Sequence, residues 1–277
     1  MPRLAGCLVI SGVILGLFVD VVRAEALRLF DTHIHYSHDA WEQYPPQDAL
    51  EILRQAGLSK AFVSSSPDDG TQRLYRLAPD FVVPVLRPYR KRGELHSWVD
   101  DPTVVEMLAE RLAGNRYAGI GEFHVTGADA DKPAVRGLVD LARTHGLFLH
   151  AHADADAIVR IFNHDPAARV LWAHAGFEDR ERVVGMLEAY PELRADLSFR
   201  FEHVSGGAVT PAWRKTFLRF PERFTIGTDT YTPSRWQDVG DYLTWVRGWL
   251  ADLPEPVRSN IAFRNAERLL ASNPNAM

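Results

Sequence analysis

The segment LFDTHIHYSHD, residues 29–39, carries His33 and His35 two positions apart, at the end of an apolar run. Residues two apart on an extended strand point to the same face, so both imidazoles would lie side by side. Two imidazole nitrogens supply half of a zinc shell, and a catalytic zinc site needs about three protein ligands and an open position. The pair alone is weak evidence, because a polar surface loop can also contain such histidines.

More imidazoles and carboxylates stand where other apolar runs end. They are Glu122 and His124, His150 and His152, His174, and Asp229. Scattered surface histidines would not occupy this position repeatedly. In a parallel barrel the carboxyl ends of the strands share one face, and catalytic groups lie there. The pattern therefore predicts one metal site built from several strand ends.

Short apolar runs alternate with amphipathic segments along the chain, which indicates βα units and a parallel sheet. The predicted strands span residues 27–33, 60–65, 81–87, 117–124, 147–152, 169–174, 193–199 and 223–229. The predicted helices span residues 46–57, 102–114, 132–146, 154–165, 178–191, 236–253 and 256–272. This rhythm in about 250 residues predicts an α/β fold, the (β/α)8 TIM barrel. A doubly wound open sheet is the alternative, but it calls for a glycine-rich phosphate loop where this chain has DTHIH.

The first 24 residues have the features of a secretion signal peptide. Arg3 precedes a mostly apolar run over residues 4–22, and VRA at residues 22–24 places small residues at a cleavage site. We expect cleavage after Ala24, with Ala26 as the second choice and an uncleaved membrane anchor as the alternative. Residues 25–277 would then form one barrel domain.

Composition excludes several kinds of protein. Cys7 is the only cysteine, so the mature chain would have no disulfide and no thiolate metal site. The net charge of −5 without clustered arginines is not the basic footprint of a nucleic-acid binder. An exported protein without disulfides fits a bacterial periplasm, with no membrane contact after signal cleavage. The sequence does not indicate the oligomeric state.

The ordered set of strand-end motifs resembles the amidohydrolase superfamily of metal-dependent hydrolases. The matching segments are DTHIH, GLFLHAHAD, LWAHAGF and IGTDT. IAFRNAERLL near the C-terminus is similar to the N-A-x-R-L segment of the amidohydrolase-2 branch, and IGEFH resembles the IGE of TatD-type enzymes. The resemblance extends over nearly the whole mature chain. It implies a TIM barrel with a divalent metal and a hydrolytic reaction.

The resemblance implies metal ligands residue by residue. They are His33, His35, Glu122, His152, His174 and Asp229. His152 is preferred to His150 because it lies six residues past Gly146, the spacing of GLPVxxH in TatD-type enzymes. Glu122 either bridges two ions or orients a ligand histidine, so one ion and two ions both stay open. Zinc is the preferred metal, and manganese, iron or cobalt also suit nitrogen and oxygen ligands.

The same resemblance implies the catalytic roles. Asp229 would take the proton of the attacking water, and His174 would bind a second metal or contact the substrate and the water. Candidate substrate-binding residues are His124, His150, Arg87, Arg200 and Arg235. The expected reaction is hydrolysis of an ester, lactone, amide or phosphoester bond in a small molecule. The alternatives are non-oxidative decarboxylation of an aromatic acid on the same fold and, third, a non-catalytic metal- or ligand-binding barrel.

Overall fold

A computed structural model of the protein describes residues 27–91 and 93–271. Within it, eight strands form one parallel sheet in the order β1-β2-β3-β4-β5-β6-β7-β10. Their bounds are β1 Leu29–Ile34, β2 Leu58–Val63, β3 Val82–Leu86, β4 Gly119–Val125, β5 Phe148–Ala153, β6 Val170–Trp172, β7 Leu193–Asp196 and β10 Phe224–Thr225. The strands follow one another in chain order, as expected for successive βα units.

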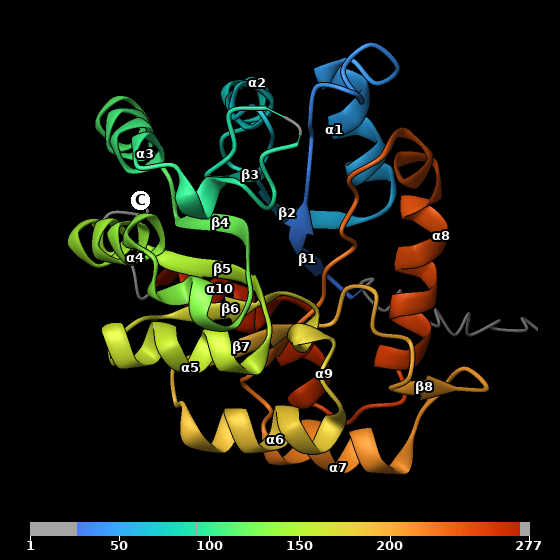
Figure 1. The fold of residues 1–277 in the computed structure, drawn as a ribbon. Helices are drawn as coiled ribbons and strands as arrows, with labels where there is room; N and C mark the ends of the chain where they lie inside the picture. The colour runs from blue at the N-terminus through green and yellow to red at the C-terminus, as the bar shows by residue number, and fades with distance from the viewer. Residues whose placement is uncertain (1–26, 92, 272–277) are drawn as a thin grey trace, which may run out of the picture.

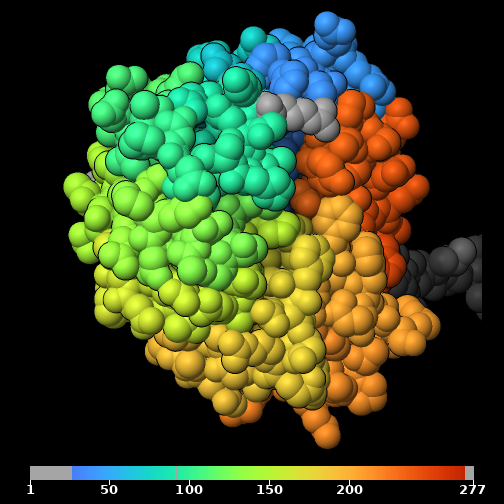
Figure 2. Space-filling view, in the orientation of Figure 1, coloured from blue at the N-terminus to red at the C-terminus, as the bar shows by residue number. Residues whose placement is uncertain are grey.

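Backbone hydrogen bonds close the sheet between β1 and the segment after β10. The amide of Asp229 donates to the carbonyl of His33 over 2.7 Å, and the amide of His35 donates to the carbonyl of Thr230 over 2.8 Å. The first and last units are therefore neighbours, which Figure 2 shows as adjoining blue and orange surfaces. The predicted (β/α)8 barrel is confirmed.

Helices lie around the outside of the strands (Figure 1). They are α1 Pro46–Gln55, α2 Asp69–Leu77, α3 Thr103–Gly114, α4 Pro133–His145, α5 Ala155–His164, α6 Arg180–Ala189, α7 Pro211–Arg219, α8 Pro233–Leu250, α9 Val257–Ser259 and α10 Asn265–Ala271. Several begin at proline, which lacks the N–H that a first helical turn leaves unpaired. Helices α2 and α7 were not predicted, because both are short and rich in polar residues.

Shorter elements lie in the connections. They are the 3-10 turns η1 Trp98–Asp100, η2 Gly127–Asp131 and η3 Ala173–Phe177, the π-helical turn η4 Asn260–Arg264, and the antiparallel pair β8 Val204–Ser205 and β9 Ala208–Val209. The last predicted helix is thus divided into α9, η4 and α10. Of these, η3 matters most for function, because it contains His174.

Apolar side chains fill the lower part of the barrel. Phe30, Phe62, Val85, Ala118, Phe148 and Leu171, from β1 to β6 and their flanks, pack with Ala266 and Leu269 of α10. The ring centroids of Phe62 and Phe148 lie 5.0 Å apart. Side chains from successive strands of a closed sheet can meet in this way only inside the barrel. These side chains form an apolar layer inside the barrel, below the polar residues at the carboxyl ends of the strands.

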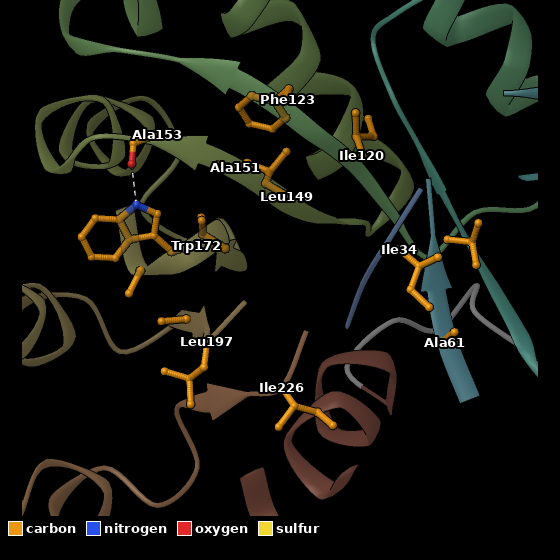
Figure 3. Packing of buried hydrophobic residues seen from close by; sticks show 14 of the residues in the cluster. Ile34, Ala61, Ile120, Phe123, Leu149, Ala151, Ala153, Trp172, Leu197 and Ile226 are labelled. Atoms are coloured by element: carbon orange, nitrogen blue, oxygen red, sulfur yellow. Dashed lines mark hydrogen bonds between the residues drawn. The ribbon is translucent and has the colours of Figure 1, made fainter. Parts of the chain in front are cut away.

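The outer faces of the strands pack against the helices. Figure 3 shows part of this layer, including Leu149, Ala151 and Ala153 of β5 beside Trp172. The indole N–H of Trp172 donates to the carbonyl of Ala153 over 2.6 Å. Because side chains alternate along a strand, the remaining β5 residues, Phe148, His150 and His152, face the barrel interior. The two histidines therefore lie at successive levels above the phenylalanine floor.

Three strands are much shorter than predicted, and the one predicted over residues 169–174 forms only Val170–Trp172. The strand predicted over residues 193–199 ends at Asp196, and the one predicted over 223–229 forms only Phe224–Thr225. Beyond the last backbone hydrogen bonds between the strands, a side chain accepts the free amides instead. A carboxylate oxygen of Asp31 accepts the amides of His33 at 2.9 Å and Thr228 at 3.1 Å. Asp31 thus holds the backbone at the base of the site through its side chain.

The predicted signal peptide, residues 1–24, lies outside the described residues. Among the helices of residues 27–91 and 93–271, none combines the length and the apolar character needed to cross a bilayer.

Candidate metal centre

His33 and His35 present the same ring nitrogen to one point. Their Nε2 atoms lie 3.1 Å apart. Nδ1 of His35 donates to the carbonyl of Ser64 over 2.8 Å, and Nδ1 of His33 lies 3.1 Å from a carboxylate oxygen of Asp196. With both Nδ1 protons used in this way, each Nε2 keeps a lone pair. Facing lone pairs repel each other unless a cation lies beside them, and two nitrogens at about 2.0–2.1 Å from one tetrahedral ion would be about 3.3 Å apart.

Two carboxylates complete this cluster. The Glu122 carboxylate lies 3.2 Å from Nε2 of His35 and 3.5 Å from Nε2 of His33. Oδ1 of Asp229 lies 3.3 Å and 3.5 Å from the same two nitrogens. Imidazole nitrogens and carboxylate oxygens are ligands that zinc and related divalent ions accept. The residues therefore fit a divalent cation at this point.

His174 supplies a third imidazole from η3. Its Nε2 lies 3.7 Å from the carboxylates of both Glu122 and Asp229, and its Nδ1 donates to the carbonyl of Ser198 over 2.9 Å. His174 and Asp229 have φ angles of 54° and 45°. Residues other than glycine rarely adopt this left-handed backbone, and its strain is typical of functional sites. The chain is held there in the conformation that directs both side chains to the centre.

The charges around His33 favour a positive charge at the centre. Burial by itself would lower the pKa of His33, but the carboxylates of Asp229, Glu122 and Asp196 raise it well above the usual value. Burial would likewise raise the pKa of Glu122, but the neighbouring histidines hold it well below its ordinary range. The acids are therefore ionised, and a cation at this place would balance them.

The two histidines of β5 have different environments. His152 is half-buried, and its Nδ1 lies 2.9 Å from a carboxylate oxygen of Glu122. His150 is buried one level deeper, and its Nε2 lies 3.1 Å from Asp196. Burial lowers the pKa of His150 to about 4, so this ring is neutral. Of the two, only His152 lies beside the carboxylate predicted to bind metal.

Asp196 was missing from the predicted site. Its carboxylate faces His33 and His150 and accepts the amides of His174 at 3.2 Å and Ser198 at 2.9 Å. Burial would raise its pKa, but the charge of His33 and hydrogen bonds with the His150 and His33 rings hold it well below the ordinary range. The strand-end rule could have found Asp196. It did not, because that strand was predicted to continue to residue 199.

Gly121, directly before Glu122, lies where β4 and β5 approach each other closely. A Cβ atom at this position would lie 2.1 Å from the carbonyl oxygen of His150, and the φ angle is +139°. Only glycine allows β4 and β5 to approach so closely here.

The three predicted substrate arginines have other contacts. Arg87 lines the cavity above the centre, and its guanidinium donates to the Glu122 carboxylate over 2.9 Å and to the Glu122 carbonyl over 3.1 Å. Arg200 donates to the carbonyl of His174 over 3.0 Å, and Arg235 to the carbonyl of Asp229 over 2.8 Å. Within the described chain, neither Arg200 nor Arg235 lines this cavity. Their hydrogen bonds fix the strained backbone of His174 and Asp229, and their contact with substrate stays a prediction.

A cavity of about 440 Å³ opens above the centre, and Glu122, His152, His174 and Asp229 are among its walls. On one side, β4 and the loops after β1, β2 and β3 contribute Ser37, His38, Asp39, Ser66, Arg87, Tyr89, Lys91 and His124. On the other, the segments after β6, β7 and β10 contribute Phe177, Phe199 and Tyr231.

His124 is fixed by Tyr89. The buried Tyr89 hydroxyl accepts the backbone amide of His124 over 2.7 Å and lies 3.0 Å from its Nδ1. Because this hydroxyl already accepts one hydrogen bond, its own proton goes to Nδ1, the acceptor within reach. Burial lowers the pKa of His124 to about 3. Because Nδ1 accepts the proton of the Tyr89 hydroxyl, the proton of the His124 ring lies on Nε2, which makes this nitrogen a hydrogen-bond donor.

Comparison with known proteins supports the architecture. No family profile matches the chain, and no curated protein matches it in sequence. Among solved structures, an uncharacterised TIM-barrel protein from Bordetella bronchiseptica has 15% identity and a TM-score of 0.62, over 89% of this chain and 99% of that one. An amidohydrolase from Burkholderia multivorans has 15% identity and a TM-score of 0.52, over 88% and 99% of the two chains. A TatD homologue from Escherichia coli has 16% identity and a TM-score of 0.54, over 89% and 99%.

At these identities the likeness shows the fold. This chain has the TIM barrel found in amidohydrolase and TatD-like hydrolases, together with buried histidine and acid clusters that could hold a metal.

Proposed function

We propose that this protein is a metal-dependent hydrolase of the amidohydrolase type, which cleaves an ester, lactone, amide or phosphoester bond of a small molecule. The main observation is the pair of Nε2 atoms of His33 and His35, 3.1 Å apart, with Nδ1 of each ring already engaged. With Nδ1 engaged, the Nε2 atoms of the two rings are the nitrogens left to bind an ion.

His33, His35 and Asp229 would hold the ion, with Glu122 and His174 completing the shell. A divalent ion in this place supplies Lewis acidity and brings the pKa of water towards about 7. Zinc is the ion we favour, since the donors are nitrogen and oxygen atoms without thiolates, and manganese, iron or cobalt would also suit them.

Asp229 would accept the proton of the attacking water and pass it to the leaving group. Burial would raise the pKa of this carboxyl, but the neighbouring His33 and His35 lower it, so Asp229 is ionised and can act as a base. Arg87 would hold Glu122 in place through its two hydrogen bonds.

A second ion would require Glu122 to bridge. Glu122, His124 and His152 also have ligand atoms within 4.8 Å of one another. However, the proton that we assign to Nε2 of His124 makes this ring a donor, so His152 and His174 are the better partners for Glu122.

Hydrolysis is favoured over decarboxylation by the arginines. In the decarboxylase interpretation an arginine would hold the acid group, but Arg200 and Arg235 bind backbone carbonyls and Arg87 binds Glu122. A barrel that binds metal without catalysis is also less favoured, because an ionised Asp229 lies beside the histidines.

The experiment is a substrate panel of an ester, a lactone, an amide and a phosphoester, offered to the protein after reconstitution with zinc, manganese, iron or cobalt. We expect turnover of at least one class with uptake of one water per bond cleaved. Release of carbon dioxide without consumption of water would identify the decarboxylase instead.

We also propose export to a bacterial periplasm with removal of residues 1–24. N-terminal sequencing of protein from the periplasmic fraction should begin at Glu25, and a chain that retains Met1 in the membrane fraction would contradict this.

A further inference from the structure

The cavity above the metal centre has two chemically different sides. The strands follow one another around the barrel, so the units after β2 and β3 lie across the axis from those after β6 and β7. Ser66 and Lys91 therefore stand across the cavity from Phe177 and Phe199. The first wall is mostly polar, with Leu95 as an apolar member, and the second is aromatic.

The aromatic wall is continuous with the metal centre. The ring of Phe177 stacks on that of His174, with centroids 4.6 Å apart and planes 15° apart. The ring centroid of Phe199 lies 5.7 Å from that of His174 and 6.3 Å from that of Tyr231. A flat group beside these rings would reach the centre directly.

Two of the three rings are exposed, whereas Phe199 is half-buried with the Arg235 guanidinium 4.0 Å from its ring centroid. Phe177 is 56% exposed and Tyr231 is 44% exposed. Phe177 and Phe199 also have φ angles of 53° and 56°, a left-handed backbone that is a true outlier for bulky residues. An exposed ring on a strained backbone does little for stability, and it is the combination expected where a ligand makes contact.

We propose that the substrate has a planar ring, which lies against Phe177, Phe199 and Tyr231, and that the oxygen of its reacting group accepts a hydrogen bond from Nε2 of His124. The assignment rests on the proposed hydrolytic function, which it narrows to small ring-bearing substrates. His124 suits this role because its ring stacks 4.2 Å from that of His152, next to Glu122. Aromatic side chains prefer to stack on flat rings.

Two matched esters test the ring. Methyl phenylacetate and methyl cyclohexylacetate have the same leaving group and similar acyl carbons, but only the first has a flat ring. With the metal-loaded enzyme we expect a kcat/KM about tenfold higher for the phenyl ester. Phe177→Leu, which keeps an apolar side chain but loses the flat ring, should abolish this preference. The control is Phe201→Leu, because Phe201 is similarly exposed and lies outside the cavity.

Binding of the product acids gives a second readout that does not need turnover. By calorimetric titration, phenylacetate should bind more tightly than cyclohexylacetate, and Phe177→Leu should remove the difference. His124→Leu should weaken both acids in parallel, because it removes the donor and leaves the aromatic wall.

The outcomes separate this inference from the proposed function. If both esters are hydrolysed equally well and Phe177→Leu changes neither, the ring inference is wrong and the hydrolase stands. If no class of the substrate panel is hydrolysed but phenylacetate binds preferentially, the hydrolase assignment fails and the ring site stands. Equal binding of both acids to the wild type would overturn the inference by itself.

Discussion

The role of each histidine is set by what binds its second nitrogen. In His33 and His35 an acceptor holds Nδ1, so Nε2 is free to bind an ion. In His124 the Tyr89 hydroxyl donates to Nδ1, so Nε2 becomes a donor. His203 lies among tryptophan and phenylalanine rings and belongs to the packing. Histidine thus acts in this protein as a proposed metal ligand, as a hydrogen-bond donor and as a packed core residue. The spacing of histidines in the sequence does not distinguish these three roles.

The first prediction concerns the proposed base. Asp229→Asn should lower kcat by roughly 10²–10⁴-fold, the range of general acid–base catalysis, because the amide cannot accept a proton. The circular dichroism spectrum and the unfolding midpoint should stay near those of the wild type. A variant that keeps full activity on the best substrate of the panel would contradict the role of Asp229.

The second prediction concerns Asp196, whose carboxylate lies beside Nδ1 of the proposed ligand His33, on the side of the ring away from the metal centre. Asp196→Asn should weaken metal binding by roughly 10–100-fold, as is usual when the partner of a ligating histidine is changed. The measurement is competition with a chromophoric chelator. Asp140→Asn is the matched control, because Asp140 is an exposed acid on α4 that pairs with Arg143. Equal affinities in both variants would remove Asp196 from the site.

At the scale of elements, strand ends were predictable and turns were not. Apolar runs mark the strands, and the polar residue that follows each run marks the site, so His33, Glu122, His174 and Asp229 could be brought together from the sequence. Asp196 was missed because no apolar or turn signal marks the early end of β7. The contacts of Arg200 and Arg235 with backbone carbonyls were not predicted, because no residue pattern shows where the carbonyls of tight turns point.

The strained loops give a prediction about stability. Phe177→Gly should stabilise the protein by about 1 kcal/mol, because glycine adopts a positive φ without strain and Phe177 is largely exposed. The variant should at the same time lose its preference for the phenyl ester. Urea unfolding measures the free energy, and Phe201→Gly provides the comparison.

Phe201 has similar exposure but no positive φ, so its replacement by glycine should destabilise the protein. Destabilisation by both substitutions would show that Phe177 contributes to packing and not to a strained ligand contact.

At the scale of the whole molecule, the residues that pack the barrel and the residues of the proposed metal site lie in different parts of the barrel. Phenylalanines fill its floor, and the acids and imidazoles gather at its mouth. The same molecule holds buried neutral histidines away from the centre. The clearest is His203, packed between Trp249 and Phe217, whose pKa burial lowers to about 4.

His203 predicts a dependence of stability on pH. The unfolded chain, with a pKa near 6.5, takes up the proton first as the pH falls. Stability that is complete above about pH 6.5 is therefore lost progressively down to about pH 4, by on the order of 3 kcal/mol from this residue. His203→Phe should lose correspondingly less between pH 7.5 and pH 4.5 in urea titrations. The other buried histidines act equally in both proteins, so an identical loss would contradict this explanation.

The central claim is that His33, His35 and Asp229 hold a divalent ion, and metal analysis of the purified protein tests it most directly. After reconstitution and desalting, elemental analysis of the wild type should give at least one divalent ion per chain. The double variant His33→Ala/His35→Ala should give almost none, while His145→Ala, a substitution outside the proposed site, should match the wild type. Wild-type protein without stoichiometric metal after reconstitution, or a double variant that retains it, would contradict the account.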